Sequence, residues 1–340
     1  MAVETQTIST AEIKPIFSRG TSTAQALGTA HEDAHTFFDF PIISYSLPYH
    51  SSTLEVAPNY SGHSGQMDTQ MRHRQDLNTW NFDVSFFGTA QAILSNCLWA
   101  FGDGASACEL TPAIGIGNGV AGDMQMKHGA TSKNHATIIF RNGGTDATAE
   151  DLTVRGAVIQ SMTIKQDIGA NAGQMTCDST FWTAYAPTEE ANAVATNITV
   201  DTSNAVKSIF DLTDAAITLN SQEIVPTSWE ITISRSLERV GSQDYSSYLP
   251  FAYAQTGAWE VTGSVNVKAD DNTYDNVAGM KGNSTGVALT IAGTNLTISC
   301  PTIMIDNATL DNGGSFLTHT IPFRAFAAST TANIISITIS

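Results

Sequence analysis

Hydrophobic and polar residues alternate almost without a break in the run AWEVTGSVNVKAD, Ala258 to Asp270. Successive side chains of a β-strand point to opposite faces, so this run predicts a strand with one apolar side and one polar side. The apolar side holds Trp259, Val261, Gly263, Val265 and Val267. The polar side holds Glu260, Thr262, Ser264, Asn266 and Lys268.

Two further runs carry the same alternation, SWEITIS from Ser228 and WNFDVSFF from Trp80. Their polar sides hold Glu230, Thr232 and Ser234 in one run, and Asn81, Asp83 and Ser85 in the other. Each run begins its apolar side with a tryptophan, and a buried indole covers on the order of 200 Å². We therefore predict that Trp80, Trp229 and Trp259 anchor the hydrophobic core.

The order of elements occurs twice along the chain. In each copy a strand is followed by a long polar segment, a tryptophan-led strand, a segment that can hold a short helix, and a group of three strands. The first helix is expected at about 91–101, where Ile93, Leu94, Cys97 and Leu98 recur at helical spacing before a GDG turn. The pattern predicts an all-β fold with short flanking helices, built from two tandem copies of one unit.

The expected boundaries follow from the two copies. Residues 1–34 are expected to form an N-terminal arm, 35–185 the first subdomain, 186–204 a linker and 205–340 the second subdomain. The long segments lie at about 54–79 and 238–257. Structureless segments of this length are unusual inside a compact domain and are often functional.

Charge narrows the classes of function. The 340 residues include 15 Lys and Arg against 32 Asp and Glu, a net charge of −17. A groove that holds nucleic-acid phosphates needs clustered cations, and no large cluster is present. The acidity is explained either by solubility or by a surface that must pass close to nucleic acid without binding it. No run is apolar enough for a membrane span, and we expect no membrane association.

The candidate chemical motifs are weak. SGHSGQ lacks the second glycine of a hydrolase nucleophile elbow, and GIGNGVAGD has the wrong spacing for a dinucleotide loop. His31 and His35 could share a helix face but have no third metal ligand. The four cysteines have no metal or redox spacing and are expected to be buried free thiols in a reducing cytoplasm. The sequence predicts no enzyme activity, no cofactor and no metal.

One local basic cluster, RHRQD at Arg72 to Asp76, lies inside the first long segment. It is either a solvated turn or a contact to an acidic neighbouring subunit, and the sequence leaves both open.

The ordered set SWEITISRSLERV, GAWEVTGSVNVKAD, LTISCPTIMIDNA and HTIPFRAFA resembles the tail tube (major tail) proteins of long-tailed bacteriophages. The resemblance covers the chain from about Ile224 to the C-terminus and, more weakly, Pro41 to Tyr185. It implies two tandem tail-tube-like β-sandwich subdomains that close into a ring-shaped β-barrel, and rings that stack into a tube through the long segments. It also implies a protein that is made in the host cytoplasm and placed in the virion tail.

On this hypothesis two copies per chain predict a homotrimeric ring with pseudo-sixfold symmetry, or alternatively a hexamer. Other tail proteins would cap the tube. The lumen would pass double-stranded DNA, with a tape measure protein as a further candidate occupant. The expected lumen-lining residues are Glu230, Thr232, Ser234, Glu260, Thr262, Ser264, Asn266, Asn81, Asp83 and Ser85. The expected contacts between rings are Tyr60, His63, Arg72, Arg74, Asp244, Tyr245 and Tyr248. The alternative function is a β-sandwich virion decoration protein or carbohydrate-binding module.

Overall fold

A computed structural model provides the structure of the chain. It describes residues 13–19, 25–30, 36–48, 53–56, 71–74, 79–102, 107–116, 124–132, 134–142, 150–191, 199–203, 216–242, 249–269, 286–293, 295–312 and 317–339. The described residues are mostly β, with a single α-helix, α1 (Ala90–Phe101), and a short 3₁₀ turn, η2 (Asn171–Gly173).

The strands of the first half of the chain are β1 (Ile13–Arg19), β2 (Gln25–Ala26), β3 (Thr36–Phe38), β4 (Ile42–Tyr45), β5 (Thr53–Val56), β6 (Met71–Arg74), β7 (Trp80–Phe87), β8 (Ala107–Leu110), β9 (Gln125–Lys127), β10 (Thr131–Ser132), β11 (Ala136–Asn142), β12 (Glu150–Asp167), β13 (Thr176–Thr183), β14 (Thr188–Ala191) and β15 (Thr199–Asp201). Those of the second half are β16 (Ala216–Leu219), β17 (Gln222–Ile224), β18 (Pro226–Ser234), β19 (Leu237–Ser242), β20 (Pro250–Gln255), β21 (Glu260–Lys268), β22 (Val287–Ala292), β23 (Leu296–Ile305), β24 (Thr309–Asp311), β25 (Thr318–Ala325) and β26 (Ile335–Ile339).

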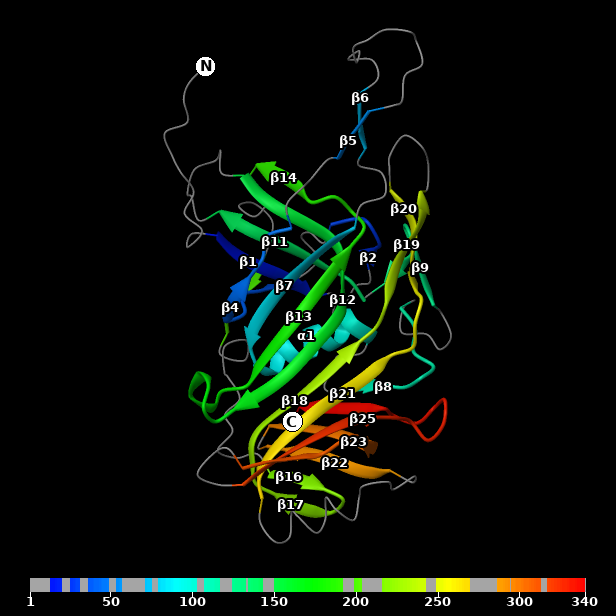
Figure 1. Cartoon of the computed structure of the whole chain (residues 1–340). Coiled ribbons are helices and arrows are strands. Elements are labelled where there is room, and N and C mark those ends of the chain that lie inside the picture. The colour runs from blue at the N-terminus through cyan, green and yellow to red at the C-terminus, as the bar shows by residue number, and fades with distance from the viewer. Residues whose placement is uncertain are drawn as a thin grey trace.

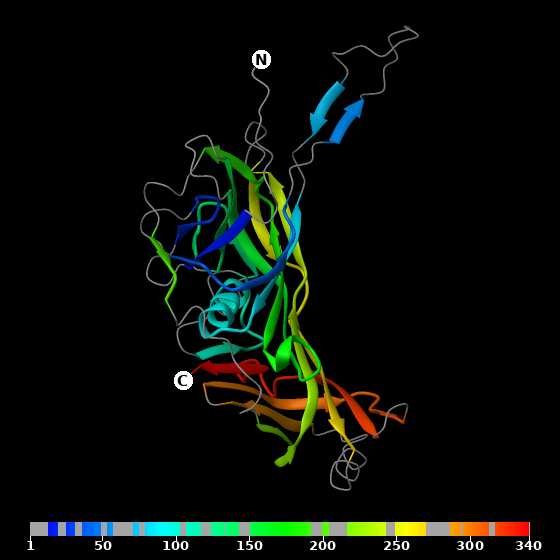
Figure 2. The ribbon, with the colours of Figure 1, turned by 90° about the vertical axis from the view of Figure 1, so that its left-hand side faces the viewer.

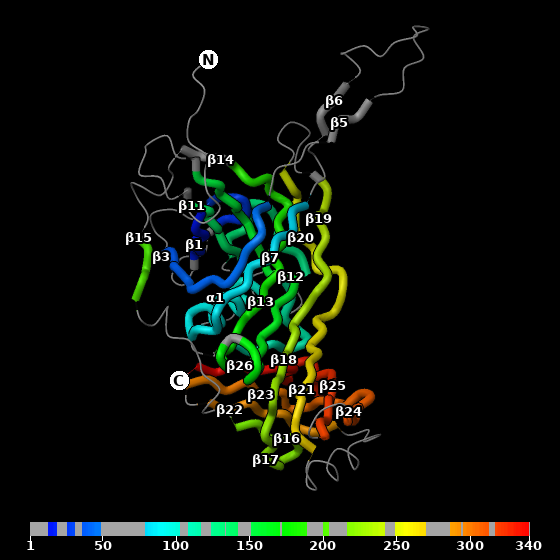
Figure 3. The backbone as a smooth tube through the Cα atoms, turned by 60° about the vertical axis from the view of Figure 1, so that its left-hand side comes forward, coloured from blue at the N-terminus to red at the C-terminus, as the bar shows by residue number. Residues whose placement is uncertain are grey.

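A long antiparallel sheet runs through both halves of the chain (Figures 1 and 3). Its strands follow the order β4-β7-β13-β12-β18-β21-β25-β24. The pairing of β12 with β18 connects the two halves, because β12 belongs to the first and β18 to the second. We call these eight strands the central sheet.

Helix α1 lies where the sequence predicts a helix. It begins after Thr89, whose side chain accepts a hydrogen bond from the amide of Ala92 at 3.2 Å, a standard N-terminal cap. It ends at Gly102, which has a φ of 83° and donates its amide to the Leu98 carbonyl. A side chain at Gly102 would also collide with Asn134. These two residues set the length of the helix.

Helix α1 packs against β12, β13 and β8, and Figure 2 shows it nearly end-on beside the sheet. Trp99 is fully buried and stacks on Phe17 of β1 at a centroid distance of 5.8 Å. The buried polar side chain of Asn96 also contacts the sheet, because the Ser179 hydroxyl of β13 donates to its Oδ1 at 2.8 Å. The helix therefore covers the apolar side of the central sheet in the first half.

The two halves repeat the same strand pairings in the same register. Ser85 of β7 lies opposite Asp178 of β13, and in the second half Asn266 of β21 lies opposite Thr320 of β25. The register shifts repeat too. The shift between β11 and β12 has its counterpart between β22 and β23. The shift between β4 and β7 has its counterpart between β18 and β21. The register makes these strands equivalent: β4 and β18, β5 and β19, β6 and β20, β7 and β21, β11 and β22, β12 and the pair β23–β24, β13 and β25, β14 and β26.

Several sequence-based expectations need correction or stay open. Residues 13–19 are not part of an arm but form β1, which pairs with β11 and β3 because Ile16 and Phe17 are buried. The ends of the expected linker form β14 and β15, which pair with β12 and β3. The second short helix, expected after Asp270, lies outside the described residues. In the described part of a single chain the sheets are not closed into a barrel, so a closed ring stays a prediction. The remaining subdomain boundaries stay predictions.

Candidate functional site: the polar face of the central sheet

Side chains from both halves of the chain share one side of the central sheet. Directly opposed residues of an antiparallel pair lie on the same side, so the register carries that side from strand to strand. One row of opposed residues crosses six strands, in the order Ser85, Asp178, Thr163, Thr232, Thr262 and Arg324. We call this side the polar face.

All ten predicted lumen residues lie on the polar face, on β7, β18 and β21. Thr180 on β13 and Ser161 on β12 connect Asp83 to Ser234 and Glu260 in a second row. The structure therefore places on one side of the same sheet three polar strand sides that are up to 185 positions apart in the sequence (Asn81 to Asn266).

Sequence reasoning missed the polar-face residues of β12, β13 and β25. They include Ser161, Thr163, Lys165, Asp178, Thr180, Thr320 and Arg324. The alternation in SMTIKQD, where Met162 and Ile164 are buried, is a signal that could have found those of β12.

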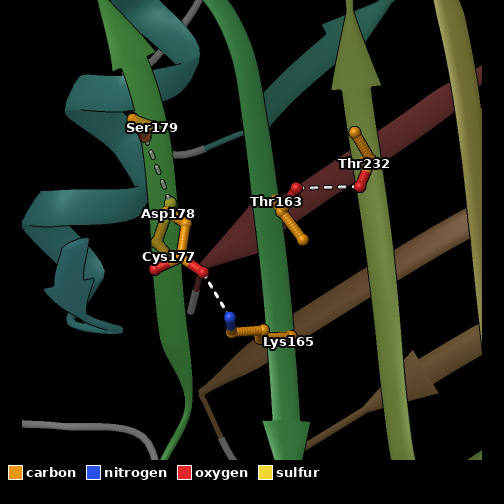
Figure 4. A network of polar contacts seen from close by, with 6 residues as sticks. All are labelled: Thr163, Lys165, Cys177, Asp178, Ser179 and Thr232. Carbon is orange, nitrogen blue, oxygen red and sulfur yellow. Dashed lines mark hydrogen bonds and ion pairs between the residues drawn. The ribbon is translucent and has the colours of Figure 1, made fainter. Parts of the chain in front are cut away.

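Hydrogen bonds link neighbouring strands across the polar face. Thr163 and Thr232 share a hydrogen bond of 2.8 Å, and Lys165 forms an ion pair with Asp178 (Figure 4). Further cross-strand bonds run from Thr180 to Asp83 at 2.7 Å, from Ser264 to Glu230 at 3.2 Å, from Asn266 to Ser228 at 2.7 Å and from Thr320 to Asn266 at 2.6 Å. Polar side chains thus bond to one another from strand to strand along this face.

Acidic groups outnumber basic groups on this face. The acids are Asp83, Asp167, Asp178, Glu230, Glu260 and Asp311, and the bases are Lys165, Lys268 and Arg324. Arg324 lies 3.8 Å from the Glu260 carboxylate, and both side chains are more than half exposed. Such exposed pairs contribute only about 0–1 kcal/mol to stability, but they offset the positive charges locally. The face carries a net negative charge.

The opposite side of the central sheet is the hydrophobic core, formed by residues such as Phe82, Val84, Ile231, Ile233 and Val265. The three predicted anchors are buried: Trp80, Trp229 and Trp259 are 7%, 2% and 8% exposed. Their burial leaves no flat indole surface of the kind a carbohydrate-binding module presents.

Trp259 is held by two contacts. Its indole nitrogen donates to the Ile114 carbonyl at 2.9 Å, and the Arg235 guanidinium lies 4.7 Å from its ring centroid. Burial lowers the pKa of Arg235 to about 9, because the charged form is poorly solvated there.

The base of the second long segment contacts the chain's own first half. Its strands β19 and β20 form a hairpin that pairs with β9. Tyr253 of β20 packs edge-on against Trp182 at 4.6 Å, and its hydroxyl donates to the Gly156 carbonyl. Of the predicted contacts between rings, Tyr60, His63, Asp244, Tyr245 and Tyr248 lie outside the described residues. Arg72 and Arg74 lie on β6, which pairs with β5, and only their backbone is described.

Other chemistry receives little support from the described residues. Cys97, Cys108, Cys177 and Cys300 are free and buried. No group of three His, Cys, Asp or Glu side chains in the described part of the chain could hold a metal. None of the helices described there is long and apolar enough to cross a bilayer.

A twofold-repeated antiparallel sheet with one apolar side and one continuous acidic polar side defines a structural β-protein that presents an extended polar surface. The sequence matches the profile of the phage tail tube protein family over residues 21–325, and the chain belongs to that family. It is a structural component of the virion tail that assembles with copies of itself and other tail proteins into a tube. This family is not an enzyme family. No curated protein matches the sequence.

Proposed function

We propose that the polar face lines the lumen of the tail tube and lets genomic DNA pass without binding it. The observation that carries this proposal is that polar side chains from both halves form one continuous face with more acids than bases. Because both halves of the chain contribute to this face, each subunit would extend the wall of the lumen.

The charge of DNA explains why such a wall is useful. Duplex DNA carries about one negative charge per 1.7 Å of axis, and Lys or Arg that neutralise phosphates bind it tightly. On the polar face the ammonium of Lys165 is paired with Asp178, and Arg324 lies near Glu260. Repulsion from the remaining carboxylates is screened beyond about 8 Å at physiological salt, so it acts only where DNA nearly touches the wall.

The repeat supports the proposed ring. Each chain supplies two halves with matching strand registers, so three chains supply six similar units in a pseudo-sixfold ring, with a hexamer as the alternative. Closing the ring pairs sheet edges that would otherwise template aggregation. The long segments at about 54–79 and 238–257 would connect one ring to the next.

The test places cations in the proposed lumen. Virions carrying Glu230→Lys and Glu260→Lys should assemble tubes of normal length but eject DNA more slowly. Purified variant tubes should retain duplex DNA at low salt and release it at high salt. Glu223→Lys is the matched control, since Glu223 is an exposed acid on β17, away from the polar face. Ejection at the wild-type rate by the double variant would overturn the lumen assignment.

A further inference from the structure

The junction between the two halves of the chain is a strand addition. The second part of β12, from Ser161 to Asp167, pairs with β18 along its whole length. At its centre Ile164 lies opposite Ile231, and the two side chains are 0% and 1% exposed. This pair seals the apolar side of the junction.

Among the described residues, the equivalent strands β24 and β4 have no such neighbour. Leu310 of β24 lies opposite His319 of β25, and Ile164 of β12 lies opposite Cys177 of β13. Because His319 and Cys177 hold equivalent positions in the two halves, Leu310 corresponds to Ile164. Leu47, just beyond β4, corresponds to Ile231. Within the part of the chain that the structure describes, β4 pairs only with β7 and β24 only with β25. Leu310 is 48% and Leu47 is 41% exposed.

A groove lies along β4 and the start of β1. It has a volume of about 850 Å³ and is lined by residues that include Ile13, Phe40, Ile43 and Leu47. Leu310 and Leu47 are thus exposed at positions where the other half of the chain has buried isoleucines. Pairing of the two strand edges between chains would bury both leucines at once.

We propose that β4 of one chain adds to the outer edge of β24 of a second copy, in the register Leu47 opposite Leu310. The inference deepens the proposed function, on which it rests, by naming the strands and the register of the contact between subunits. Ser46 would then lie opposite Asp311, and Tyr45 opposite Asn312, as Glu230 and Trp229 lie opposite Lys165 and Gln166. The polar face continues across this contact, because Ser46 and Asp311 hold the places of Glu230 and Lys165.

Pro48 is compatible with this pairing. The amide of Ser46 donates to the Asp83 carbonyl of β7, so the nitrogen of Pro48, two residues later, also faces β7. The missing N–H therefore lies on the inner side, and the N–H of Leu47 faces the open edge. A proline on an edge strand is tolerated when its nitrogen is not needed by the ladder.

Disulfide trapping tests the register. The variant Leu47→Cys/Leu310→Cys places two thiols on directly opposed residues, where Cα atoms of a hydrogen-bonded pair are about 5.5 Å apart, a distance that suits a disulfide. The four native cysteines are buried and give little background. Mild oxidation of assembled full-length protein should link chains into a ladder in denaturing gels without reductant. The ladder should end at the number of chains in one ring, three for the pseudo-sixfold ring.

Controls separate the register from mere proximity. Leu47→Cys/Asn312→Cys shifts one thiol by two residues on the same side of the strand, to a diagonal distance of about 7–8 Å, and should cross-link at least tenfold less. Neither single variant should form a ladder. Rings or tubes in which the matched pair does not cross-link, or does so no better than the shifted pair, would overturn the register and leave the proposed function intact. A wild-type chain that sediments as a monomer under all conditions would overturn both.

Discussion

Truncating one residue in each half should separate folding from assembly. Ile231 and Leu47 hold the same register position, but Ile231 is 1% exposed and Leu47 is 41% exposed. Ile231→Ala should lower the free energy of unfolding by about 2–5 kcal/mol, the usual range for deleting a buried isoleucine side chain. Leu47→Ala should lower the free energy of unfolding of the isolated chain by only about 1 kcal/mol, because this side chain is already partly exposed there.

The proposed contact between chains assigns Leu47 a different cost. Full burial of a leucine is worth about 1.5–3 kcal/mol, and the 41% still exposed in the single chain corresponds to about 1 kcal/mol per contact. That is about a fivefold loss in the association constant of each contact. A ring of three chains closes three contacts, so ring formation should weaken by about a hundredfold.

Urea unfolding and sedimentation measure the two effects separately. Unfolding is followed in dilute protein, where chains are monomeric and self-association does not stabilise the fold. Sedimentation velocity across a concentration series then gives the midpoint of assembly. The reasoning is refuted if Leu47→Ala assembles at wild-type concentrations, or if it destabilises the isolated chain as much as Ile231→Ala does.

Three further outcomes can be checked on purified protein. Gly263→Ala should lower the free energy of unfolding in urea by about 1–3 kcal/mol or more, because the added methyl would lie 2.3 Å from a backbone carbonyl oxygen of β18. The control Gly257→Ala should be nearly neutral, because its nearest contact would be 3.7 Å away. Burial, and secondarily the charge of Arg155, lowers the pKa of His128. The stability that neutral His128 contributes is therefore complete above about pH 6.5 and is lost as the pH falls through the lowered pKa. Wild type should therefore lose more stability between pH 7.5 and 5.5 than His128→Gln, and equal losses would contradict this. All four native thiols should resist an aromatic disulfide reagent at pH 8 and react after unfolding, since all are buried and burial raises the pKa of Cys177 and Cys300 to about 12. Rapid reaction of the folded chain would contradict this burial.

Local sequence pattern was sufficient for single strands and for the helix. Alternation of period two assigned the sides of β7, β18 and β21, and the structure buries Phe82, Ile231 and Val265 while leaving Asp83 and Glu230 exposed. Helix α1 was equally visible, because apolar residues recur at helical spacing ahead of a glycine.

Local pattern failed where the decisive contacts are distant. The segment IKPIFSR looks weakly patterned, yet it becomes β1 because Phe17 fits among Phe86, Trp99 and Phe181. The tryptophans that begin two alternating runs suggested that Trp80 and Trp259 are equivalent. The register instead aligns Trp80 with Val261, a shift of two residues that keeps every side chain on its side of the strand and so leaves no trace in the alternation.

The sequence by itself determined which side chains of each strand face the core, that the chain repeats, and that its surface is acidic. Only the tertiary structure decided that β12 pairs with β18, and hence that polar sides from distant segments form one face. The physical reason is the range of the interactions. The alternation of buried and exposed residues is a local pattern that a few neighbouring positions of the sequence show. The choice of neighbouring strand and its register depends on backbone hydrogen bonds and bulges between distant segments, which only the folded chain brings together.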